Sequence, residues 1–404
     1  MASDPARDAV TPTSFDHHDP VQMLDPYPGY AELRARCPVA RSDRHGGFWV
    51  VAGYDDVVAV ATDHDRFRSG DGIAVPTIVG TRVEPQESDP PRHTSVRALM
   101  VPWFSVAAVA AAEPLVRSVS ASLLDAWGER TEVELVADYA TPLASLVMLS
   151  LLGCPEEVVP RLQADIDATL HSPDDPPRRG AGAADLAECV AGLVADRRER
   201  LGRAGGPPPD DLLGRIVSAQ VDGAPVTDAE AVSLGLSLVF AGFETSANAI
   251  ATAVFHLAQR PDLWARLRAE PALVSTAVEE LLRYVSPVQV IGRTTAADDE
   301  LGGVPIAAGD TVMIAYGSAN HDPSVFTDPG DLQLDRAPNR HVAFGSGIHR
   351  CVGRHLGRLE LRVALADLVA RIARCEIADP AGVAWSFGEN RGVRALPLRV
   401  TRAS

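Results

Sequence analysis

The stretch FGSGIHRCVG, residues 344–353, places three glycines, a histidine and an arginine around Cys351. Glycine adopts left-handed backbone conformations without strain, so this stretch can turn tightly and lie close against something flat. The spacing of apolar residues that follows predicts a helix from soon after Cys351 to about Ala373. The free N–H groups at the start of that helix favour a thiolate. The stretch alone leaves four roles open for Cys351: metal ligand, nucleophile, half of a disulfide, or inert buried residue.

The composition is typical of a soluble globular protein. Hydrophobic residues make up 46% and charged residues 23% of the 404 residues, and the formal net charge is −17. Nucleic acids and anionic membranes bind clustered Lys and Arg, so we expect neither as a partner. The polar N-terminus lacks the apolar centre of a signal peptide, and no run approaches the ~18 apolar residues of a membrane span. These features predict a cytoplasmic protein, in which five scattered cysteines without a CxxC pair favour neither disulfides nor a zinc site.

The helical signal predicts one domain, mainly α with minor β, over residues 21–404, preceded by a flexible tail over residues 1–20. The longest helical segment runs from Thr227 to about Gln259 and opens with the capping-box pattern Thr227-Asp228-Ala229-Glu230. Roughly 33 residues of helix span about 50 Å. This segment is apolar almost all round, which predicts a helix buried in the centre of the fold.

Shorter elements surround this helix. A strand is predicted at Phe48–Val51 and a helix at Leu273–Tyr284. The proline- and glycine-rich segments 172–182 and 205–211 have the composition of loops, and neither is long enough to indicate a domain boundary.

AGFETS, residues 241–246, interrupts the apolar central helix with an acid and a hydroxyl, Glu244 and Thr245. Both are costly in a buried helix unless they are hydrogen-bonded or functional. Gly242 also costs about 1 kcal/mol of helix propensity relative to alanine. A groove at this point could hold a small polar ligand and relay protons. The competing explanation is a Thr that bonds back to the preceding turn, with Glu at a polar interface.

Two further pairs carry charge at helical spacing. In EELLRY, Glu280 and Arg283 lie at positions i and i+3 and can pair. In DPPRHTSVRAL, His93 and Arg97 lie at positions i and i+4, where they could bind a carboxylate together. In isolation, each pair is more simply explained as a solvated helix surface.

The four motifs together, DPPRHTSVRAL, AGFETS, EELLRY and FGSGIHRCVG, resemble those of the cytochrome P450 family, particularly its soluble bacterial members. The resemblance extends from about Asp25 to Arg399, and none of the four motifs departs from the family pattern. It implies the cytochrome P450 fold, a single domain in which a long central helix lies over a buried haem.

By this resemblance, the cofactor is haem b and Cys351 is the axial thiolate ligand of its iron. Backbone N–H groups around the sulfur would tune its redox potential. The family's propionate-binding groups match His93, Arg97, Arg293 and His349, and further cofactor contacts fall on Ala241, Gly242, Phe344, Gly345 and Gly353. Glu280 and Arg283 match a buried structural ion pair, for which Arg336 is the candidate third member.

The same resemblance implies a monooxygenase driven by dioxygen and two electrons. Thr245 matches the hydroxyl that positions dioxygen, and Glu244 the acid that helps deliver protons. The expected electron donors are a ferredoxin and its NAD(P)H-driven reductase, and the protein is expected to be a monomer. The ferredoxin would dock on the cysteine side, where basic residues cluster: Arg340, Arg350, Arg354 and Arg358.

The expected substrate is a small to medium apolar organic molecule, hydroxylated or epoxidised in secondary metabolism or catabolism. Segments 70–80 and 386–390 match substrate-contacting regions of the family, and residues 171–182 match a mobile lid. The candidate lining residues are Ile73, Val75, Ser237, Phe240, Ala241, Gln289, Ile291 and Phe387. Gln289 has a second explanation, a bond to neighbouring backbone.

Three other functions compete with the monooxygenase. A peroxide-dependent haem-thiolate enzyme is the first, although such relatives tend to lose the acid–alcohol pair that Glu244 and Thr245 form here. A non-catalytic haem carrier or sensor would not need a proton relay in the central helix. A haem-free thiol enzyme would need a base paired with Cys351, and the sequence suggests none.

Overall fold

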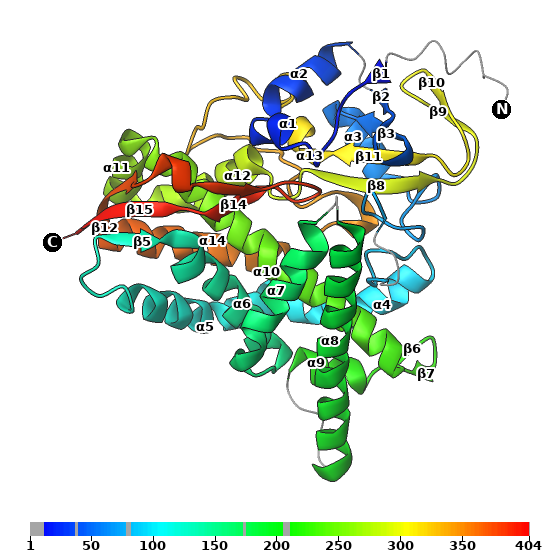
Figure 1. The fold of residues 1–404 in the computed structure, drawn as a ribbon, viewed down its shortest axis with the longest axis horizontal. Coiled ribbons are helices and arrows are strands. Elements are labelled where there is room, and N and C mark those ends of the chain that lie inside the picture. Colours follow the sequence, from blue (N-terminus) through cyan, green and yellow to red (C-terminus); the bar gives the residue numbers. More distant parts are fainter. Residues whose placement is uncertain (1–11, 37–38, 78–81, 173–174, 205–210, 404) are drawn as a thin grey trace.

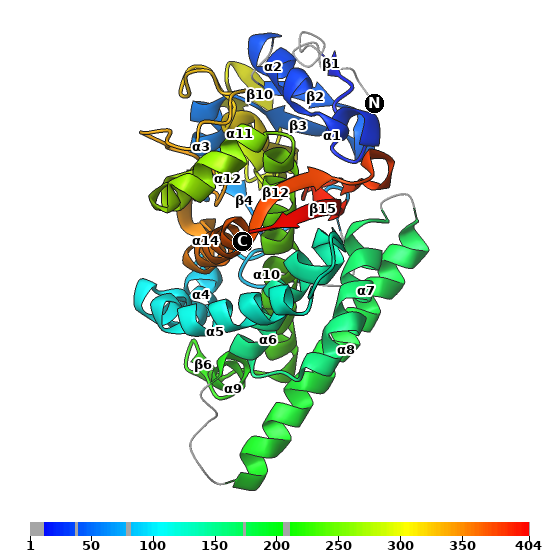
Figure 2. The same cartoon turned by 90° about the vertical axis from the view of Figure 1, so that its left-hand side faces the viewer.

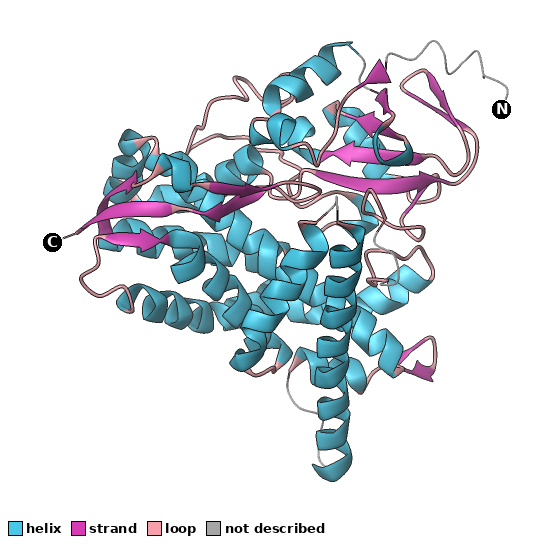
Figure 3. Cartoon of the chain, viewed as in Figure 1, coloured by secondary structure: helices cyan, strands magenta, loops and turns pink. Residues whose placement is uncertain are grey.

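The computed structural model describes residues 12–36, 39–77, 82–172, 175–204 and 211–403. Most of the molecule is helical, and strands gather along one side and near the C-terminus (Figures 1 and 3). The predicted class, mainly α with minor β, is confirmed.

The α-helices are α1 (Pro20–Leu24), α2 (Tyr27–Arg36), α3 (Tyr54–Thr62), α4 (Arg92–Met100), α5 (Val106–Asp125), α6 (Thr141–Leu152), α7 (Val159–Leu170), α8 (Pro176–Ala204), α9 (Leu212–Val217), α10 (Asp228–Ala258), α11 (Pro261–Ala269), α12 (Val274–Val285), α13 (Tyr316–Ala319) and α14 (Arg354–Arg371). Short 3₁₀ or π turns occur at η1 (Arg44–Gly46), η2 (Val101–Phe104), η3 (Val136–Ala140), η4 (Glu156–Val158), η5 (Pro271–Leu273), η6 (Gly347–His349) and η7 (Pro380–Gly382).

The strands are β1 (Pro12–Thr13), β2 (Val39–Ser42), β3 (Phe48–Val51), β4 (Phe67–Arg68), β5 (Glu132–Glu134), β6 (Gln220–Val221), β7 (Ala224–Pro225), β8 (Val290–Thr295), β9 (Asp299–Leu301), β10 (Val304–Ile306), β11 (Thr311–Ala315), β12 (Ile372–Ile377), β13 (Ala384–Ser386), β14 (Gly392–Ala395) and β15 (Pro397–Arg402). The main sheet has the order β1-β2-β3-β11-β8-β4, in which β11 pairs parallel with β3 and antiparallel with β8. This sheet positions the β8 side chains beside the site described below.

The long helix α10 begins as its capping box predicts. The Thr227 hydroxyl accepts the Glu230 N–H at 3.3 Å, and the Glu230 carboxylate accepts the Thr227 N–H at 2.8 Å. Two free N–H groups are thereby satisfied at the first turn. The helix then packs against α6, α8, α12 and α14 (Figure 2), which explains its nearly uniform apolar surface.

Residues 12–20 differ from the flexible tail expected over residues 1–20. Strand β1 pairs parallel with β2, and the side chains of Phe15 and His17 are buried. Phe15 packs against Tyr30, with ring centroids 5.8 Å apart. Contacts with segments later in the chain therefore order this stretch, although its own composition is polar. Residues 1–11 lie outside the described part of the chain.

The lid loop expected over residues 171–182 is mostly helical. Helix α8 already begins at Pro176 and runs beside α7 (Figure 2). Proline is tolerated in a first helical turn, where its missing N–H would have no partner. The Asp175 carboxylate accepts the Arg178 N–H at 3.0 Å and so caps this turn. Most of the loop predicted over residues 205–211 lies outside the described residues.

Two helices in the described part of the chain, α5 and α10, are long and apolar enough to cross a membrane by length and composition alone. In α10, 61% of the apolar window is buried inside the protein, as expected of a core helix, against 17% in α5. Helix α5 carries Glu113, which pairs with Arg117 on the same helix and with Arg362 of α14. Helix α5 is therefore joined to α14 by an ion pair, in addition to its apolar contacts.

Candidate functional site

The cysteine loop is a tight turn that ends at the start of α14. The Gly345 N–H donates to the Val342 carbonyl at 2.8 Å, and the Cys351 N–H donates to the Phe344 carbonyl at 2.9 Å. Gly353 is the N-cap residue of α14, and its backbone N–H bonds to the Cys351 sulfur. The thiol therefore lies just before a helix N-terminus, as the sequence predicts.

Opposing effects act on the Cys351 thiol. Burial raises its pKa, whereas the Gly353 N–H and the charges of Arg97, Arg354 and Arg358 favour the thiolate. No described residue forms a disulfide with it. Backbone and cationic support of this kind suits a thiolate that binds a metal ion.

Glycine is required in this loop for a reason that the sequence did not show. Gly347 has φ +69°, and a Cβ there would lie 2.4 Å from the Ala61 carbonyl oxygen. The loop thus packs directly on the backbone of α3. Gly345 has φ +70°, and its added Cβ would lie 3.4 Å from the Tyr316 hydroxyl.

Four basic side chains predicted to bind carboxylates converge near this loop: His93, Arg97, Arg293 and His349. The His93 and His349 rings lie 4.4 Å apart between centroids. Arg97 donates to the Arg350 carbonyl inside the cysteine loop. Arg293, buried on β8, bonds within its own segment to the Gly292 carbonyl at 2.7 Å. The structure therefore brings together residues that lie up to 256 positions apart in the sequence (349 − 93).

This cluster of basic side chains has little negative charge to balance it. Burial and the charge of Arg97 lower the pKa of His93 to about 4, and burial and Arg293 lower that of His349 to about 2. Burial also lowers the pKa of Arg293, which Asp89 opposes only partly. Both ring nitrogens of His93 are buried without a partner among the described residues. A dicarboxylate ligand would supply the missing acceptors.

Glu280 is the centre of a buried ion-pair network. Its carboxylate accepts from Arg283 at 2.8 Å and from the Arg336 Nε at 3.0 Å. The Gln333 N–H and the Asn339 amide also donate to it. Glu280 and Arg283 are fully buried, so this is not the solvated surface pair that the motif suggests in isolation. The network joins α12 to the segment that leads into the cysteine loop.

In the central helix, the Thr245 hydroxyl donates to the Ala241 carbonyl at 2.6 Å. This bond to the preceding turn is the competing explanation considered for AGFETS, and it also directs the hydroxyl along the surface where Ala241 is exposed. A Cβ on Gly242 would lie 2.3 Å from Met148 Cε. Gly242 therefore permits close packing of α6 on α10, whereas we expected a cofactor contact.

Glu244 is held by residues from three segments. His171, which follows α7, lies 2.8 Å from its carboxylate, and Asn390 and Asn248 donate to it at 3.2 and 3.3 Å. Burial alone would raise the pKa of Glu244, but His171 and the two amides hold it below its ordinary value. The acid next to Thr245 is thus ionised. Its partner, His171, is the first residue of the segment that we expected to form the lid. Sequence reasoning did not identify His171.

A second buried acid, Glu360 on α14, was also missed. The Ser246 hydroxyl of α10 donates to it, and burial raises its pKa to about 8. The apolar pattern LELRVALADLVA contains two acids, Glu360 and Asp367, and this was the available signal. Glu360 is therefore neutral at pH 7, next to the AGFETS motif.

Replacing Glu360 by glutamine should change the pH dependence of stability. The folded state keeps a proton that the unfolded state releases between the ordinary pKa of 4.5 and about 8, so wild-type stability falls across this window. Glutamine does not titrate, so the free energy of unfolding of the variant should gain on that of the wild type from pH 5 to pH 8, by up to roughly 4 kcal/mol. The difference in Tm between the two proteins should grow in the same direction. Scanning calorimetry at several pH values measures it. Glu129→Gln, which replaces an exposed acid, is the control, and its stability should depend on pH as that of the wild type does. If the stability of Glu360→Gln also depends on pH in the same way as the wild type, Glu360 is not a buried neutral acid.

The residues expected to line the substrate pocket separate into two groups. Gln289 is fully buried, donates to the Val285 and Ser286 carbonyls and accepts from the Tyr30 hydroxyl. Gln289 therefore bonds to neighbouring backbone, which was the alternative to a substrate contact. Ser237 is likewise buried and donates to Gln86 at 2.5 Å. Their hydrogen bonds leave both residues little capacity to contact a substrate.

The other lining candidates are apolar. Ile73 lies against β8, since its carbonyl accepts the Gly292 N–H at 2.8 Å. Val75 is buried, and its N–H donates to Glu389 of the 386–390 turn at 2.8 Å. The remaining side chains, Phe240, Ile291 and Phe387, are partly buried beside the apolar cores. The two predicted substrate-contacting segments are therefore connected directly.

On the cysteine side, one of the four predicted docking arginines is already neutralised. Arg358 makes two bonds to Glu279, at 2.7 and 2.8 Å, and stacks on Phe344 at 4.4 Å. Arg340, Arg350 and Arg354 have no carboxylate partner among the described residues. The exposed side chains Arg340 and Arg350 contribute most of the accessible charge.

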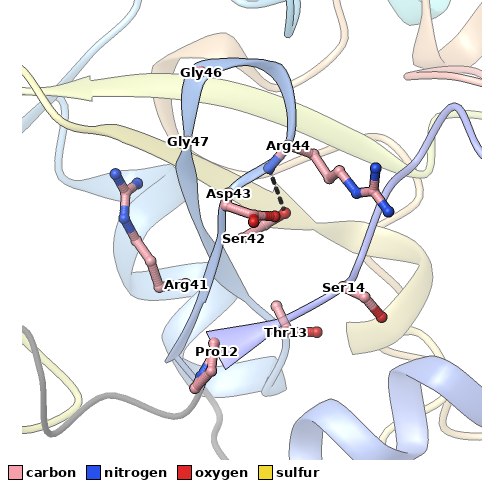
Figure 4. Close-up of a pocket in the computed structure, with 9 residues that line it drawn as sticks. All are labelled: Pro12, Thr13, Ser14, Arg41, Ser42, Asp43, Arg44, Gly46 and Gly47. Atoms are coloured by element: carbon pink, nitrogen blue, oxygen red, sulfur yellow. Dashed lines mark hydrogen bonds between the residues drawn. The ribbon is translucent and has the colours of Figure 1, made fainter.

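A pocket of about 630 Å³ lies elsewhere, between β1 and the β2–β3 turn. Figure 4 shows its nine lining residues, which include Arg41, Ser42 and Arg44. None of them belongs to the four motifs, so this pocket is not part of the candidate site.

Comparison with known proteins agrees with this geometry. The cytochrome P450 family model matches residues 178–373. Nocardicin C N-oxygenase of Nocardia uniformis subsp. tsuyamanensis is 37% identical, covering 93% of this chain and 95% of the relative. 6-Deoxyerythronolide B hydroxylase of Saccharopolyspora erythraea is 34% identical, with 93% and 96% covered. The solved structure of the bacillaene polyketide synthase cytochrome P450 PksS of Bacillus subtilis 168 superposes with a TM-score of 0.86 at 29% identity, covering 96% and 100% of the two chains.

The fold and a thiol framed by glycines beside a basic cluster define a haem-thiolate protein. The chain belongs to the cytochrome P450 family, and it is a cytochrome P450 monooxygenase with haem b as its cofactor. Members of the family use redox partners and act on a substrate with oxygen.

The residues of this chain fit that cofactor. Haem b carries two propionate carboxylates, which suit the basic cluster of His93, Arg97, Arg293 and His349. Two members of the cluster, His93 and Arg293, are buried with little negative charge nearby. A sulfur ligand for iron is available at Cys351, beside the Gly353 N–H that would support its thiolate.

Proposed function

We propose that this monooxygenase takes two electrons per turnover from a ferredoxin and its NAD(P)H-driven reductase. It inserts one oxygen atom into a C–H or C=C bond of a small to medium apolar substrate. The other oxygen atom leaves as water with two protons. The observation that carries the proposal is the acid–hydroxyl pair of Glu244 and Thr245, which α10 holds on successive residues.

When bound, the haem supplies reductive activation of dioxygen. Cys351 would hold its iron, and the basic cluster would hold its carboxylates. Thr245 presents a hydroxyl on the exposed strip of α10 at Ala241, where it can donate to or accept from dioxygen and water.

Proton delivery in this proposal starts outside Glu244, because that carboxylate is ionised. His171 lies 2.8 Å from it and can pass a proton to it. Glu244 then passes the proton through water toward the Thr245 hydroxyl. Ser246 lies on the same helix turn as Thr245 and bonds to the neutral Glu360 of α14, which provides a further proton donor.

The proposed ferredoxin binds the cysteine side through Arg340, Arg350 and Arg354. These charges stand out on a protein of net charge −17 and would steer an acidic partner. We further propose a cytoplasmic monomer.

Relatives do not fix the atom that is oxidised. One is named an N-oxygenase and another a hydroxylase, so hydroxylation and epoxidation are our proposals for this chain. The apolar candidates Ile73, Val75, Ile291 and Phe387 favour an apolar substrate, from secondary metabolism or catabolism.

Reconstitution tests the function. A compound library is first screened for spectral shifts that report displacement of water from the haem. The compounds found are then incubated with the protein, ferredoxin, reductase, NAD(P)H and isotopically labelled dioxygen. One labelled oxygen atom per product molecule is expected, with a rate that falls as salt screens the docking charges. Product formed only from added peroxide, without the reductase, would instead support the peroxide-dependent alternative.

Thr245→Ala should separate electron consumption from product formation. Without the hydroxyl, proton delivery loses its last positioned group, so haem content and substrate binding persist while most electrons appear as peroxide. A decrease in product per NAD(P)H on the order of tenfold corresponds to about 1.4 kcal/mol of lost discrimination. Peroxide and product are quantified in the same assay. Thr245→Ser, which keeps the hydroxyl, is the control, and unchanged coupling in Thr245→Ala would exclude the relay role.

A further inference from the structure

Three histidines from two separate segments meet away from the haem site. His17, His18 and His45 each offer a ring nitrogen, and these three nitrogens lie within 4.8 Å of one another. Their ring centroids are 4.1 to 5.6 Å apart. His17 and His18 belong to the N-terminal segment that was expected to be flexible, and His45 lies in the β2–β3 turn beside the pocket of Figure 4.

The His17 side chain is buried without satisfying its nitrogens. It is 0% exposed, and neither ring nitrogen has a hydrogen-bond partner among the described residues. Its Nε2 lies 3.7 Å from Glu389 Oε1, beyond hydrogen-bond distance. A buried imidazole with two unsatisfied nitrogens costs free energy that a ligand would recover.

The other two histidines are already oriented by oxygen acceptors. His18 Nε2 lies 3.0 Å from the Val75 carbonyl, and His45 Nε2 lies 2.8 Å from Asp16 Oδ1. In each ring this leaves Nδ1 as the free nitrogen, and the Nδ1 of His18 is buried without a partner. Metal-bound histidines have this arrangement, in which the second ring nitrogen donates to a carbonyl or carboxylate that fixes the ring.

We propose that His17, His18 and His45 form a binding site for a divalent transition-metal ion of the zinc class, separate from the haem. Imidazole nitrogens suit Zn²⁺, which binds them at about 2.0–2.1 Å in tetrahedral geometry. That geometry needs nitrogens roughly 3.4 Å apart, so modest ring rotations would close the cluster. The exposed position of His45 gives the ion access from solvent.

The charges around the cluster are compatible with a cation. Asp16 bonds to His45 and to the His18 N–H, and Glu389 lies next to His17. Arg179 of α8 is buried and interacts electrostatically with Glu389, so it offsets part of that negative charge. Two carboxylates against one guanidinium still favour a divalent ion over an empty site.

A bound ion would connect the N-terminal segment to the two segments that we expect to contact substrate. His18 already contacts the Val75 carbonyl, and Glu389 accepts the Val75 N–H. The ion would therefore link residues 14–18 and the β2–β3 turn to segments 70–77 and 386–390. We expect these segments to open less often when the ion is bound.

Metal uptake by the untagged holoprotein tests the site. After chelator treatment and dialysis, equilibrium dialysis against Zn²⁺ with elemental analysis should give one ion per chain. His17→Asn and His45→Asn should each weaken binding at least about 100-fold. Asp16→Asn keeps all three imidazoles and should weaken it by about 10- to 100-fold. His355→Asn, which removes an imidazole outside the cluster, should bind as the wild type does.

Hydrogen exchange gives a second readout that does not depend on activity. Zn²⁺ should slow exchange in residues 14–18 and 386–390 of the wild type, but not of His45→Asn. Haem content and circular dichroism identify any variant that fails to fold, and His45→Asn, at the surface, is the substitution least prone to do so. The proposal is overturned if the wild type does not take up one ion per chain. It is also overturned if the His17→Asn/His45→Asn double variant binds Zn²⁺ as tightly as the wild type.

Discussion

Cys351→Ser is expected to abolish monooxygenase activity to below detection and to remove the spectral signature of thiolate ligation. The reduced wild-type protein treated with carbon monoxide should show the strongly red-shifted Soret band of a thiolate-bound haem. A serine hydroxyl is a harder and far weaker electron donor than a thiolate, so the variant should lack this band. Absorption spectra and product analysis of the two purified proteins measure the effect.

The Cys154→Ser variant is a matched control for this experiment. Cys154 is also partly buried, but it packs against the apolar core and its sulfur donates to the Leu152 carbonyl at 3.8 Å. Its spectrum and activity should match the wild type. A red-shifted band that survives in Cys351→Ser, or an ordinary histidine-haem spectrum in the wild type, would contradict the assignment of Cys351.

Features encoded within a few residues could be predicted from the sequence. The capping box at Thr227 places the start of α10, and the glycines and Cys351 place the turn before α14. Each depends on hydrogen bonds between residues close in the chain, which residue types and spacing specify directly. Local spacing pairs Glu280 with Arg283, whereas the family resemblance supplied Arg336 as the third residue.

Features that depend on distant partners could not be predicted. Residues 12–20 are polar, and only pairing with β2 and burial against Tyr30 order them. Gln289 was a candidate to line the substrate pocket, but it precedes β8 and donates to carbonyls at the end of α12. The family resemblance made Gly242 a candidate cofactor contact. Its packing against Met148 could not be predicted, because that side chain lies on another helix.

Glu280→Gln is expected to reduce the free energy of unfolding by about 3–5 kcal/mol, because it leaves two buried guanidinium groups without a counter-charge. Glu280 and Arg283 are 0% exposed, and the Arg336 side chain is 7% exposed. Solvent therefore cannot replace the lost carboxylate. Urea denaturation followed by circular dichroism, together with haem content after purification, measures the loss. The network joins α12 to the cysteine loop, so we expect haem retention to fall with stability.

The neighbouring substitution Glu279→Gln separates burial from charge. Glu279 makes comparable bonds to Arg358, but its side chain is 32% exposed. Water can solvate the released arginine there, although His341 also loses its partner at 3.0 Å, so the loss should be clearly smaller than that of Glu280→Gln. The two substitutions are identical in chemistry and adjacent on one helix, so the difference between them reports what burial adds. If both variants unfold at the same urea concentration, the Glu280 network does not stabilise the fold through a buried charge balance.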